Sequence, residues 1–457
     1  MSPPSGNLIL ALNSGSSSLK ITLYSRRSPS PSSSTDAPAV DLVLSASISD
    51  ITAPPAKFKL KGKAVGKSAS SAESGGSKEE SVDSIKDHAS AFDYFLRCLE
   101  EEASIKEEDI EYICHRVVHG GNFPKPVVIT KESYEDIEHL TDLAPLHNGA
   151  ALSVIHVCID KFPHAKSVAY FDTTFHRPMP VHIASVPLDQ NIAKKKGLKK
   201  YGFHGLSYGF ILRSVAKFLS KPTEQLNLIV LHLGSGASVC VIKSGQSLDT
   251  SMGLTPVSGL PGATRSGAID PSLIFHYTNR AGKITHKPSA AAPVNVTIAE
   301  DILNRHAGWN ALTCTTDFGL IAERAELEDT DDGVAERNVY RLAFELFVDR
   351  ILNYVGAYYL KLGGQVDALV FAGGIGEKSV PLREAIVKKV RCLGFEELDE
   401  KNNADVGESK GTVVSISVPD TNKSGPGAGG RSKQILVCHT DEQFEMANDC
   451  ALDRSRW

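Results

Sequence analysis

Hydrophobic and polar positions near the start of the chain predict two β-strands joined by a short polar turn. Leu8–Leu12 is an apolar run of strand length, a Gly/Ser turn follows at 13–18, and a second strand-like run begins at Leu19. The pattern starts at Asn7 and returns without a gap at Asn227. One Gly/Ser turn is typical of an ordinary hairpin. Two such units half a chain apart instead indicate a duplicated domain with two phosphate-facing turns, in which backbone N–H groups converge on an anion.

The same periodicity predicts further strands and helices along the chain. Strands are expected at 41–51, 112–121, 168–172, 366–372 and 434–438. Helices are expected at 87–101, 135–140, 149–160, 206–219, 301–310 and 333–360, from about 381, and at the C-terminal end. A Gly-rich turn, Gly373–Glu377, lies between one strand and one helix, which is the setting of a nucleotide-binding turn.

Three stretches have too few apolar residues to pack into a core. Residues 25–38 are Ser/Pro-rich, residues 62–81 are Lys/Ser/Gly-rich, and the region 403–431 includes another low-complexity stretch. We expect the first two to be disordered insertions and the third to be a low-complexity insertion.

Composition fits a globular protein of two domains. The chain has 457 residues, 41% hydrophobic and 23% charged, which are values typical of soluble globular proteins. Its net charge of −5 gives no reason to expect nucleic acid or an anionic membrane as a partner. No apolar run approaches the ~20 residues that span a bilayer, and the Met-Ser-Pro-Pro start lacks the features of a signal peptide.

The eight cysteines are dispersed and form no C-x-x-C pair. Several lie in apolar runs, as at Cys240 and Cys438. This pattern favours buried thiols over a disulfide or metal site and predicts a cytoplasmic protein.

Two charged residues in or directly after apolar strands are candidates for chemistry. Arg116 lies in an apolar strand on the same face as Val118, and burying it requires an anion or a carboxylate partner. An internal ion pair would satisfy it as well as a ligand would. Asp172 ends the strand at 168–172, where ligands of α/β sheets bind, although it could equally cap the next segment.

Two further candidates lie in glycine-rich segments. His204 stands between two glycines that permit close backbone approach to a ligand. Arg265 is presented by the long Gly/Pro-rich loop 250–267, and loops of this length in a compact domain are usually functional. Lys20 adds a positive charge beside the first turn.

Taken in order, these motifs make the chain similar to the acetate kinase family of the acetate and sugar kinase/Hsp70/actin superfamily. The segments that carry the resemblance are 13–20, 115–121, 143–148, 171–176, 201–205, 232–238, 264–267, 373–377 and 440–443. The resemblance implies an α/β fold of two duplicated ribonuclease H-like (actin-like ATPase) domains with a cleft between them. It implies an N-terminal domain of 1–174 plus 441–457 on the carboxylate side and a nucleotide-binding domain of 175–440.

The resemblance also implies roles for individual residues. Arg116 and Arg265 would hold carboxylate and phosphoryl oxygens, Asp172 would be the essential acid, and His204 would stabilise the transition state. The acetate-binding residues would be Arg116, Val118, Leu146, His147, Phe203 and Pro256. Asn13 and Glu442 would serve Mg²⁺ or Mn²⁺. ATP or ADP would lie against Lys20, Ser16, Ser18, His232, Leu233, Gly234, Ser235, Gly236, Asp317, Phe318, Gly319, Gly374, Ile375, Gly376, Glu377 and Lys378.

Three positions depart from the family's commonest pattern, all on the nucleotide side. Ser235 and Lys378 stand where Asn is common, and Gly319 stands where Arg is common. The acceptor is therefore better supported than the donor, and pyrophosphate could replace ATP. The residues also leave open a propionate kinase, a sugar kinase that uses Asp172 as a base, and a non-catalytic nucleotide-switch protein. The resemblance further implies a homodimer.

Overall fold

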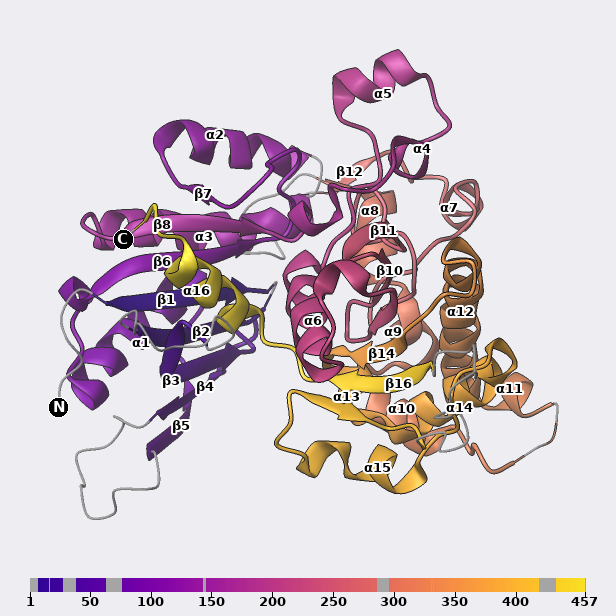
Figure 1. Cartoon of the computed structure of the whole chain (residues 1–457). Helices are drawn as coiled ribbons and strands as arrows, with labels where there is room; N and C mark the ends of the chain where they lie inside the picture. Colours follow the sequence, from indigo (N-terminus) through magenta and orange to yellow (C-terminus); the bar gives the residue numbers. More distant parts are fainter. Residues whose placement is uncertain are drawn as a thin grey trace. The chain divides into compact units, whose positions relative to one another are not determined.

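The computed structural model describes residues 7–15, 17–27, 38–62, 76–142, 145–285, 296–329, 331, 333–418 and 433–456. The chain divides into two compact units. Unit 1 contains the described residues of Met1–Thr174 and Asp441–Trp457, and unit 2 contains those of Phe175–Thr285 and Val296–Thr440. Each unit is built on one β-sheet (Figure 1).

The sheet of unit 1 has the strand order β5-β4-β3-β2-β1-β6-β8-β7. Its strands are β1 (Leu8–Ser14), β2 (Leu19–Arg26), β3 (Val40–Ser49), β4 (Ala56–Gly62), β5 (Gly76–Val82), β6 (Ile110–Val117), β7 (Val127–Val128) and β8 (Lys166–Phe171). The pairs β1–β6 and β6–β8 are parallel, and the other pairs are antiparallel.

Helices cover both faces of this sheet because its central strands are buried on both sides. The helices are α1 (His88–Ala103), α2 (Lys131–His139), α3 (Pro145–Lys161) and α16 (Glu442–Leu452). Ile113 of β6 joins the core formed with α1 and α3. The next residue, Cys114, points to the opposite face, where its thiol lies 3.9 Å from the Met446 carbonyl of α16.

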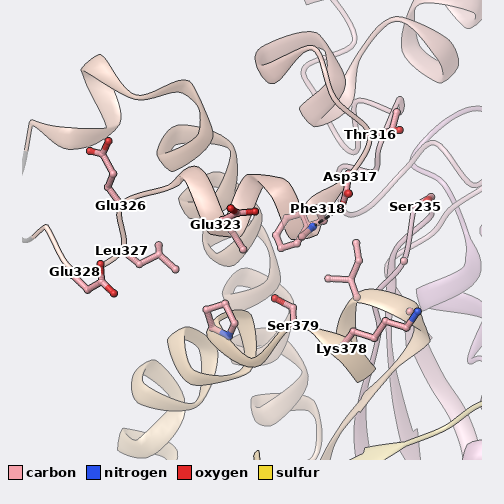
Figure 2. Close-up of a pocket in the computed structure, with 16 residues that line it drawn as sticks. Ser235, Thr316, Asp317, Phe318, Glu323, Glu326, Leu327, Glu328, Lys378 and Ser379 are labelled. Carbon is pink, nitrogen blue, oxygen red and sulfur yellow. Dashed lines mark hydrogen bonds between the residues drawn. The ribbon is translucent and has the colours of Figure 1, made fainter. Parts of the chain in front are cut away.

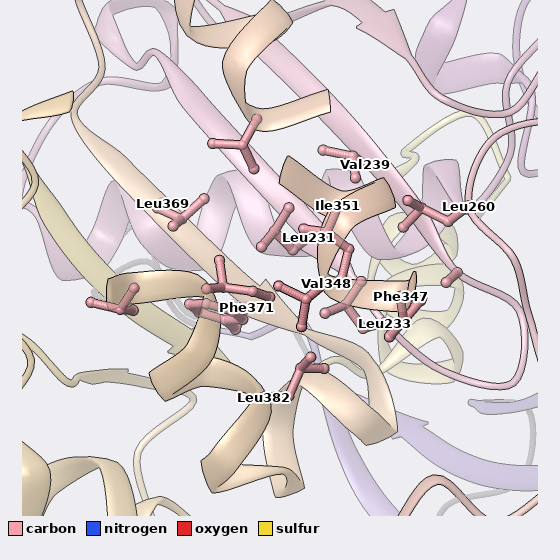
Figure 3. Packing of buried hydrophobic residues seen from close by; sticks show 14 of the residues in the cluster. Leu231, Leu233, Val239, Leu260, Phe347, Val348, Ile351, Leu369, Phe371 and Leu382 are labelled. Carbon is pink, nitrogen blue, oxygen red and sulfur yellow. The ribbon is translucent and has the colours of Figure 1, made fainter. Parts of the chain in front are cut away.

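The sheet of unit 2 has the order β11-β10-β9-β14-β16-β15. Its strands are β9 (Leu228–His232), β10 (Ser238–Lys243), β11 (Gln246–Thr250), β14 (Ala368–Ala372), β15 (Val413–Ser415) and β16 (Gln434–Cys438). A small separate sheet pairs β12 (Ile284–Thr285) with β13 (Val296–Thr297). The main core packs the 23-residue helix α12 (Val339–Lys361) and α14 (Val380–Val390) against β9, β10 and β14 (Figure 3).

Shorter helices complete unit 2. They are α4 (Val181–Ala184), α5 (Gln190–Lys196), α6 (Gly205–Phe218), α7 (Leu273–Tyr277), α8 (Ile298–Arg305), α9 (Gly308–Thr313), α10 (Phe318–Arg324), α11 (Val334–Arg337), α13 (Gly373–Lys378) and α15 (Glu400–Ala404).

The duplication inferred from the repeated sequence is confirmed by strand order. In unit 1 the series β3-β2-β1-β6-β8-β7 has the same order and the same parallel and antiparallel pairings as β11-β10-β9-β14-β16-β15 in unit 2. The two repeated sequence stretches form β1–β2 and β9–β10, at equivalent places in their sheets.

The prediction of disorder over 62–81 was wrong for its last part, since Gly76–Val82 forms the edge strand β5. This strand is held by its backbone pairing with β4, by the buried Val82 side chain and by polar side-chain contacts. Glu79 forms an ion pair with Lys59 of β4 at 2.7 Å, and Tyr94 donates to Glu80 at 2.6 Å. A charged edge strand of this kind also resists pairing with other chains.

The low-complexity region 403–431 likewise contains defined elements, the end of α15 and the strand β15. The remaining parts of the predicted insertions, 28–37, 63–75 and 419–432, lie outside the described residues.

Two helices expected as single elements are each divided in two. The helix predicted at 301–310 breaks between α8 and α9, where Gly308 has φ +67° and an added Cβ would clash with the Gly262 carbonyl oxygen. The helix predicted at 333–360 breaks at Asn338, whose side chain accepts from two backbone N–H groups at the start of α12. The predicted Gly-rich turn after β14 is itself the short helix α13.

Candidate functional site

A cluster of four polar side chains lies in unit 1. Asp172 receives two hydrogen bonds from Arg116, from Nε to Oδ1 at 3.1 Å and from Nη2 to Oδ2 at 2.7 Å. Nη1 of the same guanidinium donates to Glu442 Oε2 at 2.6 Å and to Asn13 Oδ1 at 3.2 Å. Asn13 Nδ2 donates to the same Glu442 oxygen at 2.7 Å. Four residues far apart in the sequence therefore form one network.

Sheet topology explains why these residues meet. Asn13 and Arg116 lie near the carboxyl ends of the parallel strands β1 and β6, and Asp172 directly follows the third parallel strand, β8. Carboxyl ends of parallel strands share one edge of a sheet, which is where α/β proteins bind ligands. Glu442 is the first residue of α16, a helix that packs on β1 and β6.

The network is nearly closed to solvent. The Asp172 side chain is 0% exposed and that of Arg116 is 16% exposed. Burial by itself would lower the pKa of Arg116, but the charges of Asp172 and Glu442 outweigh burial and raise it. Arg116 therefore has the internal ion pairs that its burial requires, and its contact with a ligand stays a prediction. Its internal ion pairs are made with the residues that the resemblance implicates in catalysis and metal binding.

The turn between β1 and β2, which is expected to bind an anion, uses one of its backbone N–H groups internally. The Gly15 N–H donates to the Ser18 carbonyl at 2.8 Å, so this group is used inside the turn. Lys20 is exposed and lies directly opposite Asn13 in the antiparallel register. Ser16 lies outside the described residues.

Residues of the expected acyl pocket are divided between the two units. Val118 follows Arg116 by two positions and is partly buried in unit 1, whereas Phe203 and Pro256 are buried in unit 2. Leu146 and His147 belong to α3, but their side chains lie outside the described part of the structure.

In unit 2, the loop residue Arg265 lies beside the turn that follows β9. Its Nη1 donates to the Pro256 carbonyl at 3.2 Å. A Cβ added to Gly236 would lie 2.5 Å from Arg265 Nη2, so the absence of a side chain at Gly236 makes room for the guanidinium. The Arg265 guanidinium therefore lies against Gly236, in the turn between β9 and β10.

His204 is held in an unusual backbone conformation at the start of α6, with φ +60°. Its Nδ1 lies 2.9 Å from Ser238 Oγ, and its ring stacks on His232 with centroids 4.2 Å apart. The segment is supported by His176, whose Nε2 donates to the Phe203 carbonyl at 2.9 Å. The sequence analysis did not single out His176, although its place at the end of the 171–176 motif could have identified it.

A pocket of about 690 Å³ in unit 2 is lined by eight of the thirteen nucleotide residues expected in that unit (Figure 2). The predicted residues that line it are Gly234, Ser235, Asp317, Phe318, Gly319, Gly374, Ile375 and Lys378. Further lining residues, which sequence reasoning missed, are Thr316, Ala322, Glu323, Glu326, Leu327, Glu328, Ser379 and Pro381. Glu323, Glu326 and Glu328 lie in a charge-rich stretch, which usually marks a solvated face, so no sequence signal pointed to these three residues.

Five predicted nucleotide residues of unit 2 do not line this pocket: His232, Leu233, Gly236, Gly376 and Glu377. Leu233 is fully buried and joins the core. The Glu377 carboxylate accepts from the Thr440 hydroxyl at 3.3 Å and lies 3.1 Å from His439 Nδ1. Both residues therefore have partners within unit 2, and their contact with a nucleotide stays a prediction.

The pocket has opposite charges at its two ends. Glu326 and Glu328 lie at one end in Figure 2, and Lys378 lies at the other beside Ser235. Asp317 caps α10 through Oδ1, which accepts from the Gly319 N–H at 2.8 Å. Such a pocket fits a ligand with an anionic end and a neutral, partly apolar end.

Two buried histidines predict a dependence of stability on pH. Burial lowers the pKa of His115 to about 3 and that of His176 to about 4. In the unfolded chain their pKa is near 6.5, so below that pH the unfolded state binds protons that the folded state does not. We expect each of these two histidines to lower the free energy of unfolding by about 1 kcal/mol when the pH falls from 7 to 5.5.

Urea titrations at the two pH values measure this loss. The control is His156→Gln, because the His156 side chain is 68% exposed, and the variant should keep the wild-type pH dependence. Equal stability of the wild type at pH 7 and pH 5.5 would contradict the assignment.

A magnesium ion is compatible with the donor set in unit 1. Mg²⁺ prefers oxygen ligands and is commonly bound through one or two carboxylates together with substrate phosphates. Asn13, Asp172 and Glu442 offer such oxygens. Within the part of the chain that the structure describes, no group of three or more His, Cys, Asp or Glu side chains is arranged to hold a metal by itself.

Among the residues that the structure describes, no helix is long and apolar enough to cross a membrane.

Comparisons with known proteins show the family and the fold of this chain. Residues 8–444 match the acetokinase family. A probable acetate kinase of Emericella nidulans is 48% identical, with 97% of each chain covered. A propionate kinase structure from Francisella tularensis superposes with TM-score 0.75 at 31% identity, covering 97% of this chain and 98% of the other. The acetate kinase structure from Porphyromonas gingivalis gives TM-score 0.72 at 28% identity over the same shares of the two chains. The predicted actin-like ATPase fold is confirmed by these likenesses.

Proposed function

Because this chain belongs to the acetokinase family, we propose that it is an acetate kinase, transferring a phosphoryl group reversibly between ATP and acetate to give acetyl phosphate and ADP. The observation that carries the proposal is the network in which Arg116 joins Asp172, Asn13 and Glu442 at the carboxyl edge of the unit 1 sheet. Of the groups in this network, the guanidinium is the one suited to a small carboxylate.

The acceptor needs no general base. A carboxylic acid with a pKa near 4 is already ionised at pH 7 and can attack phosphorus directly. Asp172 is fully buried and accepts two hydrogen bonds from Arg116, which suits a residue that orients the guanidinium. The harder task is to bring an anionic acceptor to a polyanionic donor, and Arg116, Arg265 and His204 offset that repulsion.

Mg²⁺, or Mn²⁺ in its place, would be held by Asn13 and Glu442 together with donor phosphates. When bound, it would neutralise charge on the phosphoryl oxygens.

ATP is favoured over pyrophosphate by the pocket in unit 2. A site for pyrophosphate alone would need cations, and it would not need about 690 Å³ with Phe318, Ile375 and Leu327 in its lining. Lys378, a cation in that lining, and the backbone at Gly234 would take the phosphates. The nucleoside would extend toward the end formed by Leu327 and Glu328.

An acetohydroxamate assay with a panel of donors and acceptors tests this function. We expect acetyl phosphate from acetate, ATP and Mg²⁺, with little product when pyrophosphate replaces ATP. A sugar kinase would instead phosphorylate a hexose, and a nucleotide-switch protein would bind ATP without forming either product.

The size of the acyl group should affect the rate moderately. The proposed pocket includes Val118, Leu146, Phe203 and Pro256, and one extra methylene discriminates by only ~1–3 kcal/mol. We expect propionate to have a kcat/KM about 10-fold or more below that of acetate, and butyrate to be poorer still. Initial rates with the three acids measure this, and equal kcat/KM for acetate and butyrate would contradict the assigned pocket.

Two further properties follow from the family and from the cysteines. A homodimer is proposed, and sedimentation velocity of the full chain tests it. Most of the cysteines are buried thiols, which supports a reducing compartment such as the cytoplasm.

A further inference from the structure

A chain of buried hydroxyl groups leads to His204 in unit 2. Tyr208 lies one helical turn after His204 on α6, and its hydroxyl is 2.5 Å from Ser238 Oγ. The same Ser238 oxygen is 2.9 Å from His204 Nδ1. Tyr208 and Ser238 are both 0% exposed, so these contacts do not compete with water.

From this geometry, we propose that Tyr208 and Ser238 are positioning residues that hold His204 in the tautomer with its proton on Nε2. This inference rests on the proposed function, in which His204 contacts the transferring phosphoryl group. To that function it adds two specific points: the ring nitrogen of His204 that carries the proton, and the residues that determine this tautomer.

The direction of the hydrogen bonds follows from the donors available. A phenol, with a pKa near 10, is a stronger donor than an aliphatic hydroxyl, so Tyr208 donates to Ser238 Oγ across the short 2.5 Å contact. The Ser238 proton then points to His204 Nδ1, which accepts it. In a neutral imidazole one nitrogen accepts and the other carries the proton, so Nε2 is the donor.

The opposite arrangement, in which both Tyr208 and His204 donate to Ser238, is disfavoured. It would leave the Ser238 proton without an acceptor, since within the described ranges no third hydrogen-bond partner of Ser238 Oγ is found. An unsatisfied buried hydroxyl costs about 1–3 kcal/mol. The proposed direction satisfies every hydroxyl proton in the chain of contacts.

The tautomer matters because of the charge on the reacting group. Equatorial oxygens of a transferring phosphoryl group are anionic and require a donor. Nε2–H provides one without a net positive charge, whereas the other tautomer would present a lone pair to an anion. Stacking of His204 on His232, at an interplanar angle of 29°, restrains the ring that makes this contact.

Nitrogen-15 NMR of the full chain labelled at histidine tests the proposal. The imidazole ¹⁵N shifts distinguish a protonated from an unprotonated ring nitrogen, and His204→Gln identifies the relevant signals. We expect Nε2–H in the wild type, and a mixture with Nδ1–H in Tyr208→Phe and Ser238→Ala. Nδ1–H or a doubly protonated ring in the wild type at about pH 7.5, where a free imidazole is mostly neutral, would overturn the proposal. This readout requires no turnover.

Kinetics give a second readout. We expect Tyr208→Phe and Ser238→Ala to lower kcat about 10-fold or more with little change in either KM, while Ser238→Thr restores the hydroxyl and most of the rate. The matched control is Tyr359→Phe, which removes a phenol hydroxyl bonded to the Leu393 carbonyl elsewhere in unit 2. Unchanged kcat in both Tyr208→Phe and Ser238→Ala would contradict the proposal. A wild type without acetate kinase activity, but with Nε2–H observed, would instead count against the proposed function.

Discussion

Replacing Arg116 by lysine is expected to lower kcat by on the order of 10²-fold or more, by analogy with the loss of an oxyanion donor. The guanidinium makes four hydrogen bonds at once, two to Asp172 and one each to Glu442 and Asn13. An ammonium keeps the charge but cannot reproduce the planar, two-pronged contact with a carboxylate. Acetyl phosphate formation at saturating acetate and ATP measures the effect.

An exposed arginine–aspartate pair provides a matched control for this substitution. Arg27 makes the same kind of two-pronged pair, with Asp41 in unit 1, but the two side chains are 46% and 54% exposed. Arg27→Lys should therefore leave kcat within about twofold and leave the temperature of thermal unfolding nearly unchanged. Thermal unfolding of both variants separates a loss of catalysis from a loss of fold. A folded Arg116→Lys protein with near-normal kcat would remove Arg116 from the mechanism.

Gly236→Ala is the second substitution with a large expected effect. The new methyl group would lie 2.5 Å from Arg265 Nη2, and the flexible arginine would move away before the backbone does. We expect kcat to fall on the order of 10²-fold, as for Arg265→Lys, with little loss of stability. The measurement is kcat beside the unfolding free energy of each variant.

Gly356→Ala provides the control, since a Cβ at Gly356 in α12 meets nothing within 4 Å. It should retain wild-type activity and gain slightly in stability because alanine favours a helix. Wild-type kcat in Gly236→Ala, with Arg265→Lys impaired, would show that the guanidinium is not confined by Gly236.

The duplicated strand–turn–strand unit could be predicted well from the sequence. The stretches beginning at Asn7 and Asn227 revealed the duplication because strand periodicity and turn residues are local properties. Arg116 could be identified because a guanidinium in an apolar strand requires a partner. Its partners could not be identified from that strand alone, since Asp172 and Glu442 meet it only through sheet order and the packing of α16.

Predictions failed where polar residues stabilise an element by pairing. Strand β5 has a low apolar content and forms because it pairs along its length with β4, buries Val82 and adds the Lys59–Glu79 and Tyr94–Glu80 contacts. Composition alone favours disorder for such a segment. The motif around Glu377 did not reveal the partners of its carboxylate, because His439 and Thr440 reach it from a distant part of the sequence.

Phosphorus-31 NMR of the purified full chain with acetate, ATP and Mg²⁺ tests most directly whether this protein joins a small carboxylate to a phosphoryl group. We predict that acetyl phosphate and ADP appear together in equal amounts, and that both signals require acetate. ADP and inorganic phosphate without acetyl phosphate, or bound ATP that is never consumed, would contradict this prediction.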